Sequence, residues 1–171
     1  ASKGNPQDIK SYLKDLAMSL EIRFPSQEDM KRGIQLINKT NQFNLNGKRY
    51  TEEEIKKIVK KGGSLITGVL NDRYGNHGEI ICMLVDNSGV ILAYVMSCRV
   101  FQREIEYIFM SALSSLPFTR FQMKYIETVK NAPFNKFLNS IKLIKDQESL
   151  YISMAEILNK VDSRKTLFKL L

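Results

Sequence analysis

Three β-rich runs lie within residues 65–96, which read LITGVLNDRYGNHGEIICMLVDNSGVILAYVM. We expect strands over Leu65–Tyr74, Glu79–Val85 and Val90–Met96, joined by turn-forming residues at Gly75-Asn76 and at 86–89. This pattern predicts an antiparallel three-stranded meander. Both alternating sets of side chains in the middle run are apolar, so the sheet needs helices on both of its faces.

Further elements are predicted on either side of the meander. Before it come a helix over Asp8–Ala17, a strand over Ser19–Phe24, a helix capped by Ser26 that fades near Asn41, and a helix from Thr51 to Lys61 opened by a Thr51–Glu54 capping box. After it come a helix over Gln102–Leu116, a strand over Phe118–Thr128, a helix over Pro133–Ile141, two weaker strands around Leu143 and Tyr151, and a helix from Ala155. This order predicts a single domain over residues 1–171, of the α/β or α+β class with a mixed central sheet.

The composition favours a globular protein with an anionic partner. Of the 171 residues, 43% are hydrophobic and 26% charged, and the formal net charge is +8. No apolar run approaches the roughly 18 residues of a membrane span, and the polar first ten residues lack the apolar core of a secretory signal. The two cysteines lack metal-site or redox-motif spacing, so we expect a cytoplasmic protein with reduced thiols. Nucleic acid is the weakest of the anionic partners, because no nucleic-acid-binding signature is recognisable.

The hairpins suggest a catalytic triad. If Asn87 and Ser88 form a two-residue loop, the pairing sets Cys98 opposite His77, and a similar loop at Gly75-Asn76 places Asp72 nearby on the same face. A thiol, an imidazole and a carboxylate in that order suit nucleophilic thiol catalysis, with backbone N–H groups after Cys98 as oxyanion donors. The alternative is that Cys98 is a small buried hydrophobe and His77 a turn residue, since a one-residue slip turns a side chain to the other face.

The segment from Arg99 to Glu104 joins the last strand of the meander to a helix. Exposed N–H groups there could hold a phosphate or an oxyanion, with charge from Arg99 and Arg103. The alternative is a helix cap with solvated arginines.

Five separated motifs resemble the C-terminal domain of FkbH-like proteins: KTNQFN (39–44), RYT (49–51), DRYGNHG (72–78), SCRV (97–100) and TVKNAP (128–133). The resemblance implies a GNAT-like acyltransferase fold and an activity that handles a short, glyceryl-type acyl thioester and transfers it to an acyl carrier protein. It also implies a phosphatase-like partner domain of the haloacid dehalogenase type. No Asp-x-Asp motif of that domain occurs here, so we expect the chain to be a separated domain or a C-terminal half.

The resemblance also implies site residues. Cys98 would accept the acyl group and His77 would be its base, and the hairpin pairing adds Asp72 to orient the imidazole. The implied substrate-binding residues are Thr40, Asn41, Gln42, Asn44, Arg73, Arg99, Arg103, Lys130 and Asn131. No metal ligand is implied.

Two departures from the family pattern bear on the cofactor. Gln102 and Glu104 stand where the family commonly has glycines, and a carboxylate there disfavours the pyrophosphate of free coenzyme A. Phe137-Leu138 stand where a GNAT enzyme often has a tyrosine general acid. The sequence therefore favours a carrier-borne phosphopantetheine arm over coenzyme A. The alternative function is a catalytically silent module that binds the carrier or braces the phosphatase-like domain.

Overall fold

The structure is a computed structural model and describes residues 5–171. Its helices are α1 (Pro6–Asp15), α2 (Lys31–Lys39), α3 (Glu52–Lys60), α4 (Ile105–Ile108), α5 (Ala132–Asn139) and α6 (Met154–Asp162), with 3-10 helices η1 (Gln27–Asp29), η2 (Cys98–Val100) and η3 (Phe109–Ser115). Its strands are β1 (Met18–Arg23), β2 (Phe43–Asn44), β3 (Ser64–Asp72), β4 (Gly75–Val85), β5 (Val90–Met96), β6 (Arg120–Met123), β7 (Ile144–Asp146), β8 (Ser149–Ser153) and β9 (Phe168–Leu170).

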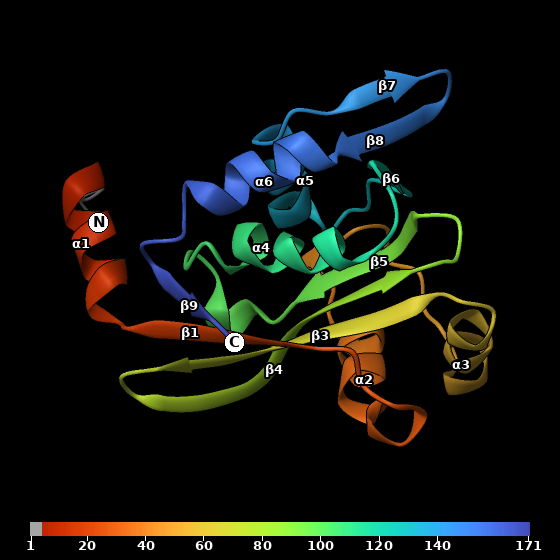
Figure 1. The fold of residues 1–171 in the computed structure, drawn as a ribbon, viewed down its shortest axis with the longest axis horizontal. Helices are drawn as coiled ribbons and strands as arrows, with labels where there is room; N and C mark the ends of the chain where they lie inside the picture. Colours follow the sequence, from red (N-terminus) through yellow and green to blue (C-terminus); the bar gives the residue numbers. More distant parts are fainter. Residues whose placement is uncertain (1–4) are drawn as a thin grey trace.

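The strands form one sheet in the order β7-β8-β6-β5-β4-β3-β1-β9, and β2 pairs with β5 beside this path. Neighbouring strands are antiparallel except for the pairs β1–β9 and β5–β6, which are parallel. The meander β3–β4–β5 lies at the centre (Figure 1). The predicted mixed sheet is confirmed, and the fold class is α+β.

Helices cover both faces of this sheet (Figure 1). On one face, α2 and α3 bury Cys82, Leu84 and other side chains of β3, β4 and β5. On the other face, Ile81 and Met83 pack in a larger cluster with residues of α4, η3, α5 and α6. Ile80, which the alternation predicts beside Cys82, joins the larger cluster, because a bulge in β4 leaves it between the pairs Gly68–Ile81 and Val69–Glu79.

Several predicted boundaries are wrong. The helix expected from Ser26 begins at Lys31, after η1. The helix expected over Gln102–Leu116 is a single α-helical turn, α4, continued by η3, and the segment before it has positive φ at Gln102 and Glu104. The strand expected over Phe118–Thr128 is only Arg120–Met123. The Thr51–Glu54 capping box and the strands near Leu143 and Tyr151 are confirmed.

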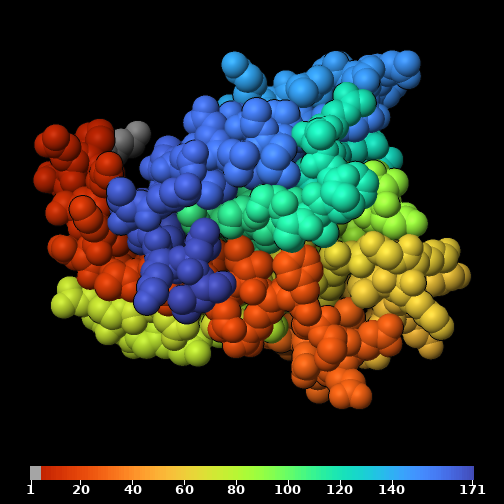
Figure 2. All heavy atoms as spheres, viewed as in Figure 1, coloured from red at the N-terminus to blue at the C-terminus, as the bar shows by residue number. Residues whose placement is uncertain are grey.

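Two strands were not predicted. β9 pairs in parallel with β1, and the space-filling view shows the blue C-terminal residues packed against red N-terminal ones (Figure 2). β2 pairs with the end of β5, at Val95 and Met96, whereas β6 pairs only with its start, at Val90 and Ile91. The chain just before β2 is thereby held beside the end of β5, where the candidate site lies.

Candidate functional site

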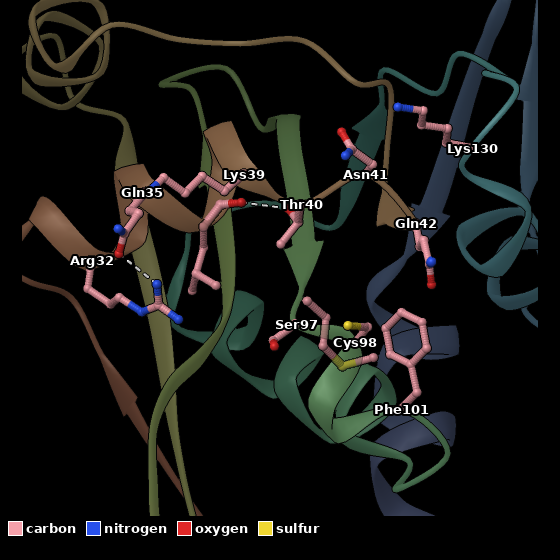
Figure 3. Close-up of a pocket in the computed structure, with 12 residues that line it drawn as sticks. Arg32, Gln35, Lys39, Thr40, Asn41, Gln42, Ser97, Cys98, Phe101 and Lys130 are labelled. Carbon is pink, nitrogen blue, oxygen red and sulfur yellow. Dashed lines mark hydrogen bonds between the residues drawn. The ribbon is translucent and has the colours of Figure 1, made fainter.

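A cleft of about 660 Å³ surrounds the end of β5 and contains the Cys98 thiol. Its walls come from one side of α2, from the loop before β2, from the β5–η2 junction and from Lys130 in the loop before α5 (Figure 3). The lining residues are Arg32, Gln35, Leu36, Lys39, Thr40, Asn41, Gln42, Met96, Ser97, Cys98, Phe101 and Lys130. Five predicted site residues, Thr40, Asn41, Gln42, Cys98 and Lys130, therefore come together.

Cys98 is exposed because the strand ends just before it. Met96 is the last residue of β5, and Ser97 caps the following 3-10 turn by accepting the Arg99 N–H at 3.4 Å. This turn buries Val100 and leaves the Cys98 side chain at the cleft. The alternative in which Cys98 is a small buried hydrophobe is wrong. Cys82 is the buried cysteine, and burial raises the pKa of its thiol well above the ordinary value.

The cleft is cationic. Arg32, Lys39 and Lys130 line it, and no carboxylate is among its lining residues. Arg32 donates to the side-chain oxygen of Gln35 at 2.7 Å, which holds both groups on one side of α2 (Figure 3). Cations without a balancing carboxylate favour an anionic ligand or an anionic partner at the mouth.

Two of the predicted substrate-binding residues have a structural role instead. Asn131 is 1% exposed and its amide donates to the carbonyl oxygens of Asn44 and Ile126, both at 2.9 Å. The Asn44 side chain is also buried; it donates to the Thr40 carbonyl oxygen at 2.9 Å and accepts the Gly47 N–H at 2.7 Å. Neither lines the cleft. They clamp the two loops that form one of its walls, so the prediction that they contact substrate is corrected.

Asp72 and His77 do lie together, as predicted, although the turn differs. Asp72 pairs with Gly75 across a turn at Arg73-Tyr74, and His77 Nε2 lies 2.9 Å from Asp72 Oδ2. Arg103 approaches the same oxygen at 2.5 Å, and the Asp72 side chain is fully buried. Burial alone would raise the pKa of Asp72, but contacts from His77, the Tyr74 N–H and Arg103 outweigh it and hold that pKa below its usual value.

The structure does not join this pair to Cys98. The β4–β5 turn contains three residues, 87–89, and the register shifts again between Leu84 and Val85. Together these pair Ile81 with Met96 and bring the Ser97 N–H to the Ile80 carbonyl oxygen. The predicted pairing of Cys98 with His77 is therefore wrong. Among residues 5–171, no hydrogen bond links the two side chains, and His77 and Asp72 are not among the residues that line the cleft.

The expected oxyanion donors are also engaged elsewhere. The N–H groups of Arg99, Val100 and Phe101 all point back into the turn, to Ser97 Oγ, the Ser97 carbonyl and the Cys98 carbonyl respectively. The Arg99 side chain approaches Ser97 Oγ at 3.3 Å and is not among the cleft-lining residues. Arg103 is held on Asp72, and Arg73 is exposed over the Tyr74 ring, so the predicted substrate roles of these three arginines are not supported by their positions.

A second cavity of about 520 Å³ adjoins the cleft, since Met96 and Phe101 line both. Its other walls combine the aromatic rings of Phe43, Tyr107 and Phe137 with polar and charged side chains. Glu106 also lines it, with one carboxylate oxygen buried and without a partner among the described residues. Burial raises the pKa of Glu106 to about 7, and the negative charge of Glu104 adds to the rise.

Three polar residues of α2 that line the cleft were not predicted as site residues. Arg32, Gln35 and Lys39 are spaced i, i+3 and i+7 along α2, which places them on one side of the helix. That spacing was the available signal, but it does not say what the polar side of the helix faces.

Comparisons with protein-family models, with curated proteins and with solved structures found no match to this chain. None of the helices within residues 5–171 is both long and apolar enough to span a bilayer. In the same part of the chain, no three His, Cys, Asp or Glu side chains are grouped as a metal site requires. The cationic cleft around Cys98 is therefore the feature on which a functional proposal can rest.

Proposed function

We propose that this chain accepts a short, glyceryl-type acyl group on Cys98 as a thioester and passes it to the thiol of an acyl carrier protein. The observation that carries the proposal is an exposed thiol in a cleft lined by Arg32, Lys39 and Lys130 and by no carboxylate. Thiolates are the reactive form of cysteine, and neighbouring cations favour a negative charge at sulfur and on the substrate. The side-chain amides of Asn41 and Gln42 add hydrogen-bond donors and acceptors for a hydroxylated acyl group.

The transfer proceeds in two balanced steps. The Cys98 sulfur attacks the carbonyl carbon of an acyl thioester, the new carbon–sulfur bond forms, the bond to the donor sulfur breaks, and the donor leaves as a thiol with the proton from Cys98. The carrier thiol then attacks the Cys98 thioester in the same way, and the proton of the carrier thiol returns to Cys98. No redox partner or metal is needed for this balance.

The partners follow from the resemblance and the charge of the cleft. A carrier-borne phosphopantetheine arm supplies the acceptor thiol, and its phosphate suits the cations of the cleft. Free coenzyme A is a weaker candidate, because the N–H groups after Cys98 are already used within the turn. A phosphatase-like domain, in the same chain or a separate one, would supply the acyl group, and the reducing cytoplasm would keep Cys98 as a free thiol. The GNAT-like fold is part of the same proposal, supported by a mixed sheet with helices on both faces.

The test is acylation of the native protein by the N-acetylcysteamine thioester of glyceric acid, followed by intact mass and peptide mapping. We expect one glyceryl adduct, on Cys98 and not on Cys82, because Cys82 is fully buried. Cys98→Ala should remove the adduct while the melting temperature stays close to that of the parent. An adduct that survives this substitution, or no adduct on the parent protein, would refute the proposal.

The second candidate function is the silent module that binds the carrier or braces the phosphatase-like domain. It is favoured by the separation of the Asp72–His77 pair from the cleft, since no hydrogen bond within residues 5–171 connects His77 with Cys98. This candidate predicts carrier binding that weakens as salt is added, without a mass shift on Cys98.

A further inference from the structure

The loop between β6 and α5 presents apolar side chains to solvent beside the cleft. Val129 is 100% exposed and Ile126 is 61% exposed, and the next residue after Val129 is Lys130, which lines the cleft that holds Cys98. Single exposed apolar residues are ordinary, but two on one short loop that leads into a cleft wall at Lys130 form a feature that a partner can cover. We refer to residues 124–130 as the rim loop.

The rim loop is held in place although its side chains are exposed. The Ile126 N–H donates to the Leu45 carbonyl oxygen at 3.2 Å, and the Ile126 carbonyl oxygen accepts from the buried Asn131 amide at 2.9 Å. The Thr128 N–H donates to the Asn131 side-chain oxygen at 2.8 Å, and the Lys124 carbonyl oxygen accepts from Asn46 at 2.9 Å. A fixed backbone lowers the entropy lost on binding, so an apolar side chain at its tip is already placed for contact.

We propose that the rim loop is the docking surface for an acidic carrier protein, whose thiol-bearing arm enters the cleft past Lys130. This inference rests on the proposed function, because it names where the partner of that same site binds. Val129 and Ile126 supply the apolar contact, and Lys124 and Lys130 face the carboxylates of the partner. A small apolar centre surrounded by charges is a common arrangement of protein interfaces.

The charge of the chain favours an acidic carrier protein over a second copy of the chain as the partner at the rim loop. The formal net charge of +8 repels another copy, whereas it attracts an acidic protein. The cleft adds Arg32 and Lys39 to the Lys130 of the rim loop and has no lining carboxylate, and Glu127 is the one acid within residues 124–130. An interface of this kind should associate faster and more tightly at low ionic strength.

The experiment measures the affinity of the full chain for an acidic holo acyl carrier protein by isothermal titration calorimetry. Val129→Asp puts a carboxylate on the fully exposed tip, and we expect it to weaken binding about tenfold or more; Lys124→Glu should also weaken binding and flatten its salt dependence. Matched controls carry the same kinds of change on distant elements: Leu171→Asp after β9, and Lys10→Glu on α1. Both controls should bind the carrier within about twofold of the parent chain.

A second readout separates this inference from the proposed function. Acylation of Cys98 by the small N-acetylcysteamine thioester does not involve the carrier, so Val129→Asp should leave its rate unchanged. If the small thioester acylates Cys98 while Val129→Asp and its control bind the carrier equally, the rim loop is not the docking surface and the proposed function stands. If Cys98 is never acylated but Val129→Asp still lowers carrier affinity, the docking surface stands and the thioester chemistry is refuted.

Discussion

Substitution of Gln102 by glycine should stabilise this protein, although most substitutions to glycine do the opposite. Gln102 has φ of 66°, in the left-handed region, and its exposed side chain makes no hydrogen bond within the described residues. A non-glycine residue in that region costs about 1–2 kcal/mol relative to right-handed backbone. Glycine removes this cost, because it adopts the left-handed conformation without a steric penalty.

The net gain is smaller than the strain. Glycine gives the unfolded chain more freedom, which costs about 0.5–1 kcal/mol, so the free energy of unfolding should rise by about 0.5–1 kcal/mol. For a domain of this size, that corresponds to a melting temperature higher by about 1–4 °C. Arg103, the next residue, should keep its contact with Asp72, because the backbone conformation does not change.

The assay is thermal and urea unfolding followed by circular dichroism. Gln102→Ala retains the Cβ atom and should change stability by less than about 0.5 kcal/mol. Lys57→Gly, at an exposed interior position of α3, should cost about 1 kcal/mol. If Gln102→Gly destabilises the protein as much as Lys57→Gly does, the left-handed backbone assigned to this position is wrong.

Two further changes test buried groups. The pKa of Glu106 lies above its ordinary value of 4.5, at about 7, so the folded protein keeps a proton that the unfolded chain releases. The stability that Glu106 contributes is therefore complete below about pH 4.5 and is lost as the pH rises through 7. Glu106→Gln should therefore raise the free energy of unfolding at pH 8 by roughly 3 kcal/mol and change it little at pH 4. Urea titrations at both pH values measure the two effects, and equal effects would contradict a raised pKa of Glu106. Asn131→Ala should lower the free energy of unfolding by about 2–4 kcal/mol, because three backbone groups lose their partner. Asn135→Ala, at a half-buried position of α5 where the amide donates only to Tyr125 among the tertiary contacts, should cost about 1 kcal/mol. Similar losses for the two variants would show that the Asn131 clamp is not a major support.

The meander could be predicted because its signals are local, but its register could not. Alternating apolar residues and turn-forming residues locate β3, β4 and β5 within a few positions. The register depends on how many residues each turn holds, and Gly89, with φ of 84°, completes a three-residue turn where a two-residue turn was expected. This residue moves β5 by one position relative to β4, and an irregularity between Leu84 and Val85 moves it by one more, so Cys98 is separated from His77.

The site shows the same division between local and long-range information. Thr40, Asn41, Gln42, Cys98 and Lys130 were predicted as site residues, and they line one cleft. Asn44 and Asn131 could not be recognised as clamps, because their hydrogen bonds join loops that are far apart in sequence. The polar side of α2 could not be assigned to the cleft either, since its position depends on how the apolar side of α2 packs against the distant strands β4 and β5.

The parallel pair of β1 and β9 sets an order of events during folding. It joins Met18 to Phe168, so the N-terminal strand waits for a partner that is made 150 residues later. Until then β1 has one unpaired edge, and closing so long a loop carries a large entropy cost that only the finished sheet can offset. Refolding should therefore have a late phase in which β9 docks, and conditions that prolong this phase should favour association of chains through the open edge of β1.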